Sequence, residues 1–328
     1  MVYRIRKKGT GNVSVSVATS SVLTYPGKDT KIMKKNSETH LTRREALAAL
    51  GAMALTAKLA GAADEAEVCT FKGIALQLYT LREPAKDDLA GTLKKVREMG
   101  WEYVQWSGMP NLEAQQIRDA LDAAGLTAVS AHIGVEGFET DFENQVAFWK
   151  TVGNADVAPG GMMGDCKDSL EAWKRGAARL DAVGAKLREV GMRLSYHNHD
   201  WELKTFEGDE RSKLDILMAE TTPGNLCAEL DLAWVKAGGA DPAETMLKFK
   251  GRCPMIHAKD LTEGKSLLTR RVRFTPLGQG ILDWPTIFEA GRQAGVEWYI
   301  YEQDNADEKD IFQCAKESYD FLKKSLMG

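Results

Sequence analysis

The sequence predicts an α/β protein whose residues 71–328 form a single (β/α)8 TIM barrel. From Gly73 onward, short apolar runs alternate with amphipathic stretches, and most of the amphipathic stretches end at a glycine. This alternation indicates parallel strands joined by helices. Eight such units in about 255 residues suit one closed barrel. An open doubly wound sheet has the same local pattern, but Gln77-Leu78-Tyr79-Thr80 stands where a dinucleotide-binding fold places a glycine-rich loop.

The first four strand–helix units are expected in the N-terminal half of this region. Each strand is a short apolar run, and the helices carry apolar residues three or four apart, such as Leu89, Leu93 and Val96. The strands are expected at 73–79, 103–106, 126–133 and, more weakly, 156–158. The helices are expected around 89–100, 117–125, 142–152 and 169–190.

The last four units follow the same pattern with one longer connection. The strands are expected at 192–197, 226–232, 255–259 and 298–302, and the helices at 213–219, 242–249, from 283 onward and at 308–324. Asp283 and Pro285 are typical of a helix start, as a cap residue and an early proline. The longer connection precedes this helix and reaches Gly278-Gln279-Gly280.

The first 63 residues differ from the rest in charge and pattern. They contain eleven Lys/Arg and three Asp/Glu, and Thr42-Arg43-Arg44 precedes an uncharged stretch over 46–57 and small residues over 60–63. This order resembles a twin-arginine export signal, and the apolar run is too short to span a bilayer. We predict a signal over 33–63, a periplasmic or extracytoplasmic location, and a start-site artefact over 1–32. An ordinary amphipathic helix is the alternative.

The remaining residues are acidic, with 32 Lys/Arg against 44 Asp/Glu. Such a surface repels phosphate backbones, so nucleic acid is not an expected partner. The chain has five cysteines, widely spaced and without a C-x2-C pair, which predicts neither a disulfide framework nor a zinc knuckle.

Histidines and carboxylates gather at the expected carboxyl ends of the strands, where a closed barrel carries its chemistry. The histidines are His132, His197, His199 and His257, and the carboxylates are Glu229, Asp231 and Glu302. Residues two apart on a strand share a face, which pairs His197 with His199, Glu229 with Asp231 and His257 with Lys259. Imidazole and carboxylate together suit manganese, zinc, iron or cobalt. A metal-free polar cluster that binds sugar hydroxyls is the alternative.

Several motifs resemble the xylose isomerase-like sugar phosphate isomerase/epimerase family. They run in family order from the first strand to the eighth, so the resemblance covers essentially the whole barrel. They are Gln77-Leu78-Tyr79-Thr80-Leu81-Arg82, Tyr196-His197-Asn198-His199-Asp200-Trp201-Glu202, Glu229-Leu230-Asp231-Leu232-Ala233-Trp234-Val235, His257-Ala258-Lys259-Asp260, Pro276-Leu277-Gly278-Gln279-Gly280 and Tyr301-Glu302-Gln303-Asp304.

The resemblance implies a divalent metal held by a Glu from the middle of the barrel, an Asp, a His and a Glu. Asp231, His257 and Glu302 match the last three, whereas His197 stands where the first Glu is expected. We therefore expect His197, Asp231, His257 and Glu302 as ligands, with His199 as the substitute for His197.

Family members that use a metal mostly abstract a proton next to a carbonyl while the metal stabilises the enediolate oxygen. We expect His199 or Glu202 as the base or acid and Lys259 to stabilise negative charge. Gln77, Gln105 and His132 are expected to contact substrate hydroxyls.

Structural roles are the alternatives for several of these residues. Lys259 and Asp260 are then surface charges that close the seventh strand, Glu202 caps the following loop, and Glu229 is an outer partner of the ligands. Trp106, Trp201 and Trp234 either stack on sugar faces or pack in the core.

The function expected first is a metal-dependent sugar isomerase/epimerase acting on a small sugar or keto-sugar. A lyase or dehydratase on an oxidised sugar or glycoside shares the enolate and differs in the leaving group. A non-catalytic sugar-binding barrel is the third class. The endonuclease branch of the same superfamily requires a basic groove, which the acidic barrel region opposes.

Overall fold

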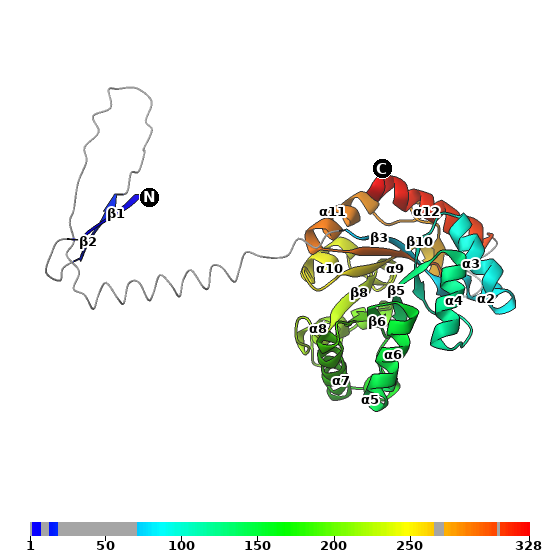
Figure 1. The fold of residues 1–328 in the computed structure, drawn as a ribbon, viewed down its shortest axis with the longest axis horizontal. Coiled ribbons are helices and arrows are strands. Elements are labelled where there is room, and N and C mark those ends of the chain that lie inside the picture. The colour runs from blue at the N-terminus through cyan, green and yellow to red at the C-terminus, as the bar shows by residue number, and fades with distance from the viewer. Residues whose placement is uncertain (1, 8–12, 19–70, 266–271, 307–308) are drawn as a thin grey trace, which may run out of the picture. The chain divides into compact units, whose positions relative to one another are not determined.

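The structure is a computed structural model that describes residues 2–7, 13–18, 71–265, 272–306 and 309–328 (Figure 1). The chain divides into two units, Met1–Glu67 and Val68–Gly328. In the first unit, β1 (Val2–Lys7) and β2 (Val13–Ala18) pair antiparallel. The expected export signal over 33–63 lies outside the described residues and stays a prediction.

The second unit is a closed barrel of eight parallel strands, which confirms the predicted fold class. The strands follow one another around the barrel in chain order, and the last pairs with the first. They are β3 (Gly73–Gln77), β4 (Tyr103–Trp106), β5 (Thr127–His132), β6 (Asp156–Ala158), β7 (Arg193–His197), β8 (Cys227–Asp231), β9 (Met255–Ala258) and β12 (Trp298–Tyr301).

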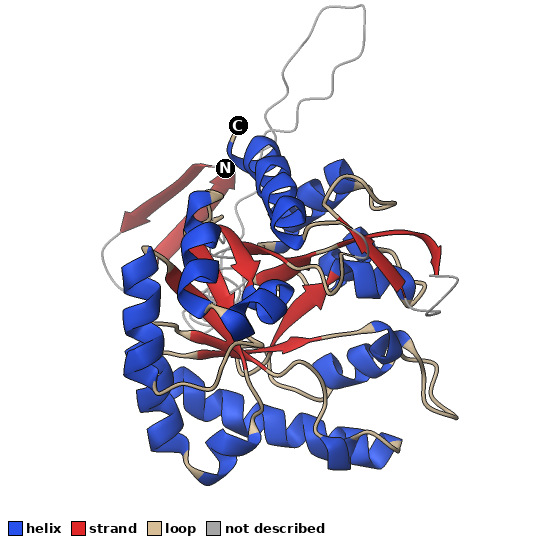
Figure 2. Ribbon diagram, turned by 90° about the vertical axis from the view of Figure 1, so that its right-hand side faces the viewer, coloured by secondary structure: helices blue, strands red, loops and turns tan. Residues whose placement is uncertain are grey.

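Helices surround these strands, as Figure 2 shows. They are α2 (Arg82–Asp87), α3 (Leu89–Glu98), α4 (Ala114–Ala124), α5 (Glu136–Thr140), α6 (Phe142–Val152), α7 (Leu170–Glu189), α8 (Lys213–Ala219), α9 (Leu232–Ala237), α10 (Pro242–Lys248), α11 (Trp284–Ala294) and α12 (Ile311–Met327). Short 3-10 turns are η1 (Leu78–Leu81), η2 (Gly164–Cys166) and η3 (Asp200–Leu203). Among the described residues, no helix is both long and apolar enough to cross a membrane.

The helix boundaries follow from local chemistry. Ser169 caps the start of α7 by accepting a hydrogen bond from the Ala172 amide, and Asp283 caps α11 in the same way. Gly125 ends α4 in the left-handed conformation with φ of 68°, which a glycine adopts without steric cost. These are the signals that fixed the expected boundaries to within a few residues.

The short helices α2 and α5 were not expected from the sequence, and two further differences lie close to the carboxyl ends of the strands. The segment after the sixth strand forms the short helix α9, because Asp231 caps it immediately at the strand end by accepting a hydrogen bond from the Trp234 amide. The connection after the seventh strand contains an antiparallel hairpin of β10 (Asp260–Lys265) and β11 (Val272–Thr275) rather than a plain loop.

The inside of the barrel is layered along its axis. At the amino ends of the strands, Ala75, Met255, Trp298 and Ile300 form a small apolar cluster separate from the main core. The next inward-facing residues along the strands are polar and buried, and they include Gln77, Gln105, Ser130, Glu229 and His257. The polar layer therefore supports the floor of whatever site opens at the carboxyl ends.

Candidate active site

A cavity of about 670 Å³ opens at the carboxyl ends of the strands. Residues from the strand ends and from the loops after them line it, which is where a barrel of this kind carries its site. The lining residues are Tyr79, Arg82, Ser107, His132, Gly160, His197, His199, Trp234, Lys259, Val272, Phe274, Glu302, Asp304 and Asn305.

The four expected metal ligands come together where the strands end, with His197 and Glu302 in the cavity wall and Asp231 and His257 buried beside them. His197 ends β7, Asp231 ends β8, His257 lies in β9, and Glu302 follows β12. Each offers one ligand atom, these atoms lie within 4.8 Å of one another, and all four residues are buried. Each carboxylate lies next to one of the two imidazoles. His257 Nδ1 lies 2.8 Å from Glu302 Oε2, and His197 Nε2 lies 3.9 Å from Asp231 Oδ2.

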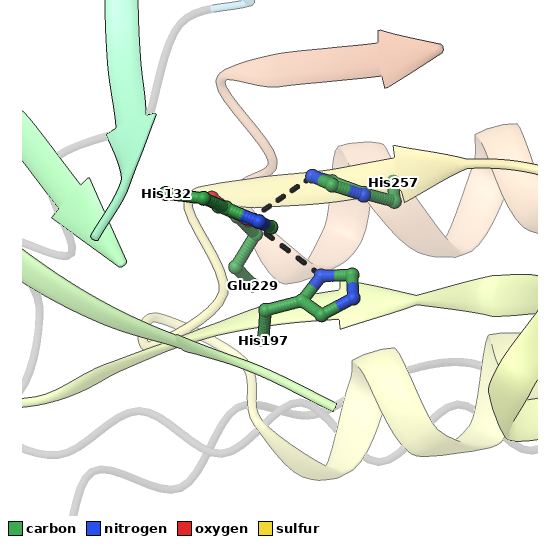
Figure 3. A group of neighbouring side chains, drawn as sticks. All are labelled: His132, His197, Glu229 and His257. Atoms are coloured by element: carbon green, nitrogen blue, oxygen red, sulfur yellow. Dashed lines mark hydrogen bonds and ion pairs between the residues drawn. The ribbon is translucent and has the colours of Figure 1, made fainter. Parts of the chain in front are cut away.

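Glu229 forms a second group with three of the histidines (Figure 3). Its Oε1 atom lies 2.5 Å from His132 Nε2, 3.0 Å from His257 Nε2 and 3.7 Å from His197 Nδ1. The sequence analysis placed Glu229 among the carboxylates at the barrel mouth, with a role as an outer partner of the ligands as the alternative. The period-two spacing of Glu229 and Asp231 was the signal that both carboxylates face the barrel interior.

His197 and His257 each direct one ring nitrogen toward Glu229 and the other toward Asp231 or Glu302. The two groups therefore share both imidazoles through opposite nitrogens. Glu302 and Glu229, working against burial, raise the pKa of His257 to about 10. Without a metal, His257 is thus an imidazolium between two carboxylates.

The donor set fits a divalent metal. Two imidazoles and two carboxylates are ligands that manganese, zinc, iron and cobalt accept. His197 turns Nε2 toward Asp231 at 3.9 Å, while its buried Nδ1 faces Glu229 at 3.7 Å and has no hydrogen-bond partner among the described residues. Burial, reinforced by the neighbouring His257, holds the pKa of His197 well below its usual value, so this imidazole is neutral and able to ligate.

Lys259 is fully enclosed rather than a surface charge, which corrects the alternative expectation. Its ammonium lies 3.1 Å from Asp231, 2.9 Å from Glu302 and 2.8 Å from Asp304. Burial alone would lower the pKa of Lys259, but these carboxylates raise it well above its usual value. The ammonium also lies 4.8 Å from the centre of the Phe274 ring. Lys259 therefore presents a fixed positive charge to the cavity.

His199 lies in the cavity wall after β7. Its ring centre is 5.2 Å from that of His197 and 5.5 Å from Trp234. Burial, and then the nearby Lys259 ammonium, lower the pKa of His199 to about 4. The imidazole is consequently neutral at neutral pH, as a base must be, and the same lowering makes it a weaker base than a free imidazole.

Glu202 has a different place from the one expected of a base. It is fully buried and is not among the residues that line the cavity. Its carboxylate accepts hydrogen bonds from the Tyr196 hydroxyl at 3.0 Å and from the His199 amide at 2.8 Å. Burial raises its pKa to about 7. The contacts match the alternative role, in which Glu202 caps the turn after β7 and orients its neighbours.

Gln77 and Gln105 lie deeper than the residues that line the cavity, and their expected contact with substrate hydroxyls stays a prediction. Both are fully buried and neither lines the cavity. Gln77 Nε2 donates to Gln105 Oε1 at 2.6 Å, and Gln105 Nε2 donates to Glu229 at 2.9 Å. The two amides face one another because their strands are neighbours with Gln77 opposite Gln105. Of the three expected substrate contacts, His132 alone lines the cavity.

Asp304, Arg82 and Phe274 line the cavity without having been expected there. Asp304 completes the carboxylate set around Lys259, and Arg82 bonds the backbone carbonyls of Tyr79 and Asp304, each at 2.8 Å. Trp234 faces the cavity beside Phe274 of the hairpin, with ring centres 5.2 Å apart. Trp106 packs in the core and Trp201 packs against Trp173, as in the structural alternative.

Comparison with known proteins agrees with this architecture. Residues 93–325 match the family model described as the xylose isomerase-like TIM barrel. The chain is 28% identical over 170 residues to a protein named inosose dehydratase from Lacticaseibacillus casei, covering 48% of this chain and 55% of that protein. The chain thus spans about half the length of that relative.

Solved structures share the fold at low sequence identity. A sugar phosphate isomerase/epimerase from Parabacteroides distasonis superposes with a TM-score of 0.65 at 22% identity, covering 78% of this chain and 99% of that one. A probable 3-DHS dehydratase from Bacillus anthracis gives 0.58 at 15% identity, covering 77% and 99%. With the family match extending over most of the barrel, this chain belongs to the xylose isomerase-like TIM barrel family.

Proposed function

We propose that this protein is a divalent-metal-dependent dehydratase or lyase acting on a keto-sugar, keto-polyol or keto-glycoside. The observation that carries the proposal is one cavity in which a neutral imidazole, His199, lies beside the imidazole–carboxylate cluster and the Lys259 ammonium. A carbon acid next to a carbonyl needs a base together with positive charge near the carbonyl oxygen. This cavity supplies both requirements.

His197, Asp231, His257 and Glu302 would hold the metal, with manganese, zinc, iron and cobalt as the candidate ions. When bound, the metal supplies a Lewis acid that polarises the substrate carbonyl. His199 removes the proton from the adjacent carbon, and Lys259 stabilises the negative charge that develops.

The elimination step balances with one base. The electron pair of the broken C–H bond forms a new C=C bond as the C–O bond on the next carbon breaks. The departing hydroxyl takes the proton from His199 and leaves as water, or a glycoside leaves as its alcohol. The similarity to a protein named inosose dehydratase favours this outcome over simple reprotonation.

Isomerisation or epimerisation, expected first from the sequence, is the second candidate because it shares the proton abstraction. His132, His199 and Lys259 line the same cavity from three different strands or the loops after them. An enolate within reach of several proton-carrying groups can be reprotonated from a new direction, which is what an epimerase requires.

The test is incubation of metal-loaded protein with an inosose and with 3-keto-glucosides in D2O. Elimination predicts a conjugated enone in the ultraviolet spectrum and release of water or alcohol. Epimerisation predicts deuterium at the carbon next to the carbonyl without a leaving group. His199→Asn should lose either activity, and Glu202→Gln, whose site lies outside the cavity, should keep it. Binding of these sugars with neither outcome would favour the non-catalytic barrel.

We also propose export through the segment over 33–63. Replacement of Arg43 and Arg44 by lysine should retain the protein in the cytoplasm of its natural host, as measured by cell fractionation. Unchanged export of that variant would refute the twin-arginine route.

A further inference from the structure

We infer that a buried chain of hydrogen bonds beneath the cavity, running from the Tyr79 amide through Gln77 and Gln105, fixes the proton of His257 on Nε2 and leaves Nδ1 for the metal. Gln105 is then a positioning residue for a metal ligand. The inference rests on the proposed metal dependence and adds to it the identity of the ligating nitrogen.

The first hydrogen bond in this buried series has a donor that can be assigned without ambiguity. The Tyr79 backbone N–H is a donor only, and it lies 3.2 Å from Gln77 Oε1. The other end of the Gln77 amide is therefore its NH2 group, which lies 2.6 Å from Gln105 Oε1. Gln105 must accept this bond with its oxygen.

The opposite end of Gln105 gives the same orientation independently. Its Nε2 atom lies 2.9 Å from Glu229 Oε2 and 3.1 Å from Ser130 Oγ. An ionised carboxylate only accepts hydrogen bonds, so the NH2 group of Gln105 faces Glu229. Reversing Gln105 would set its oxygen against the Glu229 carboxylate and its NH2 group against that of Gln77.

His257 meets this fixed amide oxygen. Its Nε2 atom lies 2.7 Å from Gln105 Oε1 and 3.0 Å from Glu229 Oε1. Both neighbours are acceptors, so Nε2 carries a proton. The other ring nitrogen, Nδ1, faces Glu302 at 2.8 Å and is the atom free to exchange its proton for a metal.

This assignment separates the two overlapping groups of possible ligands. A metal in the group with Glu302 and Asp231 uses His257 Nδ1 and leaves the buried amides paired. A metal in the group with His132 and Glu229 would use Nε2, and Gln105 Oε1 would then lose the hydrogen bond that it accepts from His257. The hydrogen-bond chain thus favours the first group.

The decisive measurement uses the full-length chain, 15N-labelled at histidine and loaded with 113Cd2+. A His257→Asn variant identifies the His257 signals. We expect 113Cd coupling on Nδ1 and a directly bonded proton on Nε2. Coupling on Nε2 would overturn the inference while leaving metal dependence intact. Failure to bind Cd2+, Mn2+ or Zn2+ at all would overturn the inference and the metal-dependent function together.

Two variants test the positioning role in the same protein. Gln105→Met removes the acceptor from His257 at similar volume and should weaken Cd2+ binding about 10- to 100-fold in chelator competition. Ser130→Ala removes another bond of the same amide, leaves that acceptor in place, and should change affinity less than about 3-fold. Gln105→Met should also shift the Nε2–H signal of His257, because Glu229 then remains as its acceptor. Unchanged affinity and an unchanged His257 spectrum in folded Gln105→Met would refute the role.

Discussion

Replacing Asp260 by Asn should destabilise the barrel although it changes only one atom. The fully buried carboxylate organises the loop that leads into α11, and neither of its oxygens has a charged partner among the hydrogen bonds described. Oδ1 accepts from the amides of Leu261 at 2.9 Å and Leu282 at 3.3 Å, and Oδ2 accepts from the amides of Gly278 at 3.1 Å and Gly280 at 3.2 Å and from Trp284 Nε1 at 2.8 Å.

The cost follows from these donors. Asparagine must direct its NH2 group at one of the two sets, so at least two buried donors lose their acceptor. Each such group costs about 1–3 kcal/mol, which predicts a loss of about 2–6 kcal/mol in the free energy of unfolding. The loop has little room to rearrange, because a Cβ on Gly280 would lie 2.1 Å from Asp260 Oδ1.

Urea unfolding at pH 7 in the presence of a chelator measures this loss without a contribution from metal binding. The matched control is Asp283→Asn, an exposed helix cap at the end of the same loop. Asparagine caps a helix about as well as aspartate, so the control should change stability by less than about 0.5 kcal/mol. If Asp260→Asn unfolds at the same urea concentration as this control, the structural role assigned to Asp260 is refuted.

Three further predictions concern the cavity and its supports. Asp231→Asn keeps the cap on α9 but removes the charge of a ligand. It should therefore weaken metal binding by more than about 100-fold, which exceeds the effect expected of an outer partner. Stoichiometric metal in this variant by elemental analysis would contradict the prediction. Glu202→Gln should leave turnover unchanged. Because burial raises the pKa of Glu202 to about 7 from a usual 4.5, the parent protein loses stability as pH rises from about 4.5 to 7. The variant lacks this loss and should gain up to about 3 kcal/mol relative to the parent by pH 8, measured by urea unfolding across pH; a pH-independent difference would argue against a buried ionising carboxyl. Lys259→Met leaves three carboxylates without their ammonium and should destabilise metal-free protein by about 3–5 kcal/mol. Added Mn2+ should raise its melting temperature more than that of the parent, and an equal rise would show that the ammonium and the metal do not share these carboxylates.

The sequence was sufficient for the barrel because its signals are local and repeated. Alternating apolar runs, caps such as Ser169 and Asp283, and left-handed glycines act within a few residues of each boundary. The α9 helix was missed because Asp231 serves both as the last strand residue and as the helix cap. A single residue with two local roles leaves no boundary signal between the elements.

The sequence predicts which side chains face the inside of the barrel, but not how far each of them lies from the cavity. Period-two spacing places Gln77, Gln105 and Glu229 on the inward face, yet it does not say whether an inward side chain reaches the cavity or the layer beneath it. That depends on the stagger of neighbouring strands, which pairs Gln77 with Gln105 and His197 with Glu229. Long-range register is not encoded in any short window of sequence.

The charges around the cavity bear on whether catalysis is possible without a metal. The carboxylates of Glu229, Asp231, Glu302 and Asp304 outnumber the Lys259 ammonium and the His257 imidazolium that lie among them. An enolate formed here adds another negative charge at close range in a poorly solvated space, where Coulomb repulsion is several times stronger than in water. A bound divalent cation would offset this excess and supply positive charge near the carbonyl oxygen. The same excess of carboxylates that suits the cluster to a metal therefore opposes enolate chemistry in the metal-free protein, which is expected to bind a keto-sugar without exchanging its α-proton.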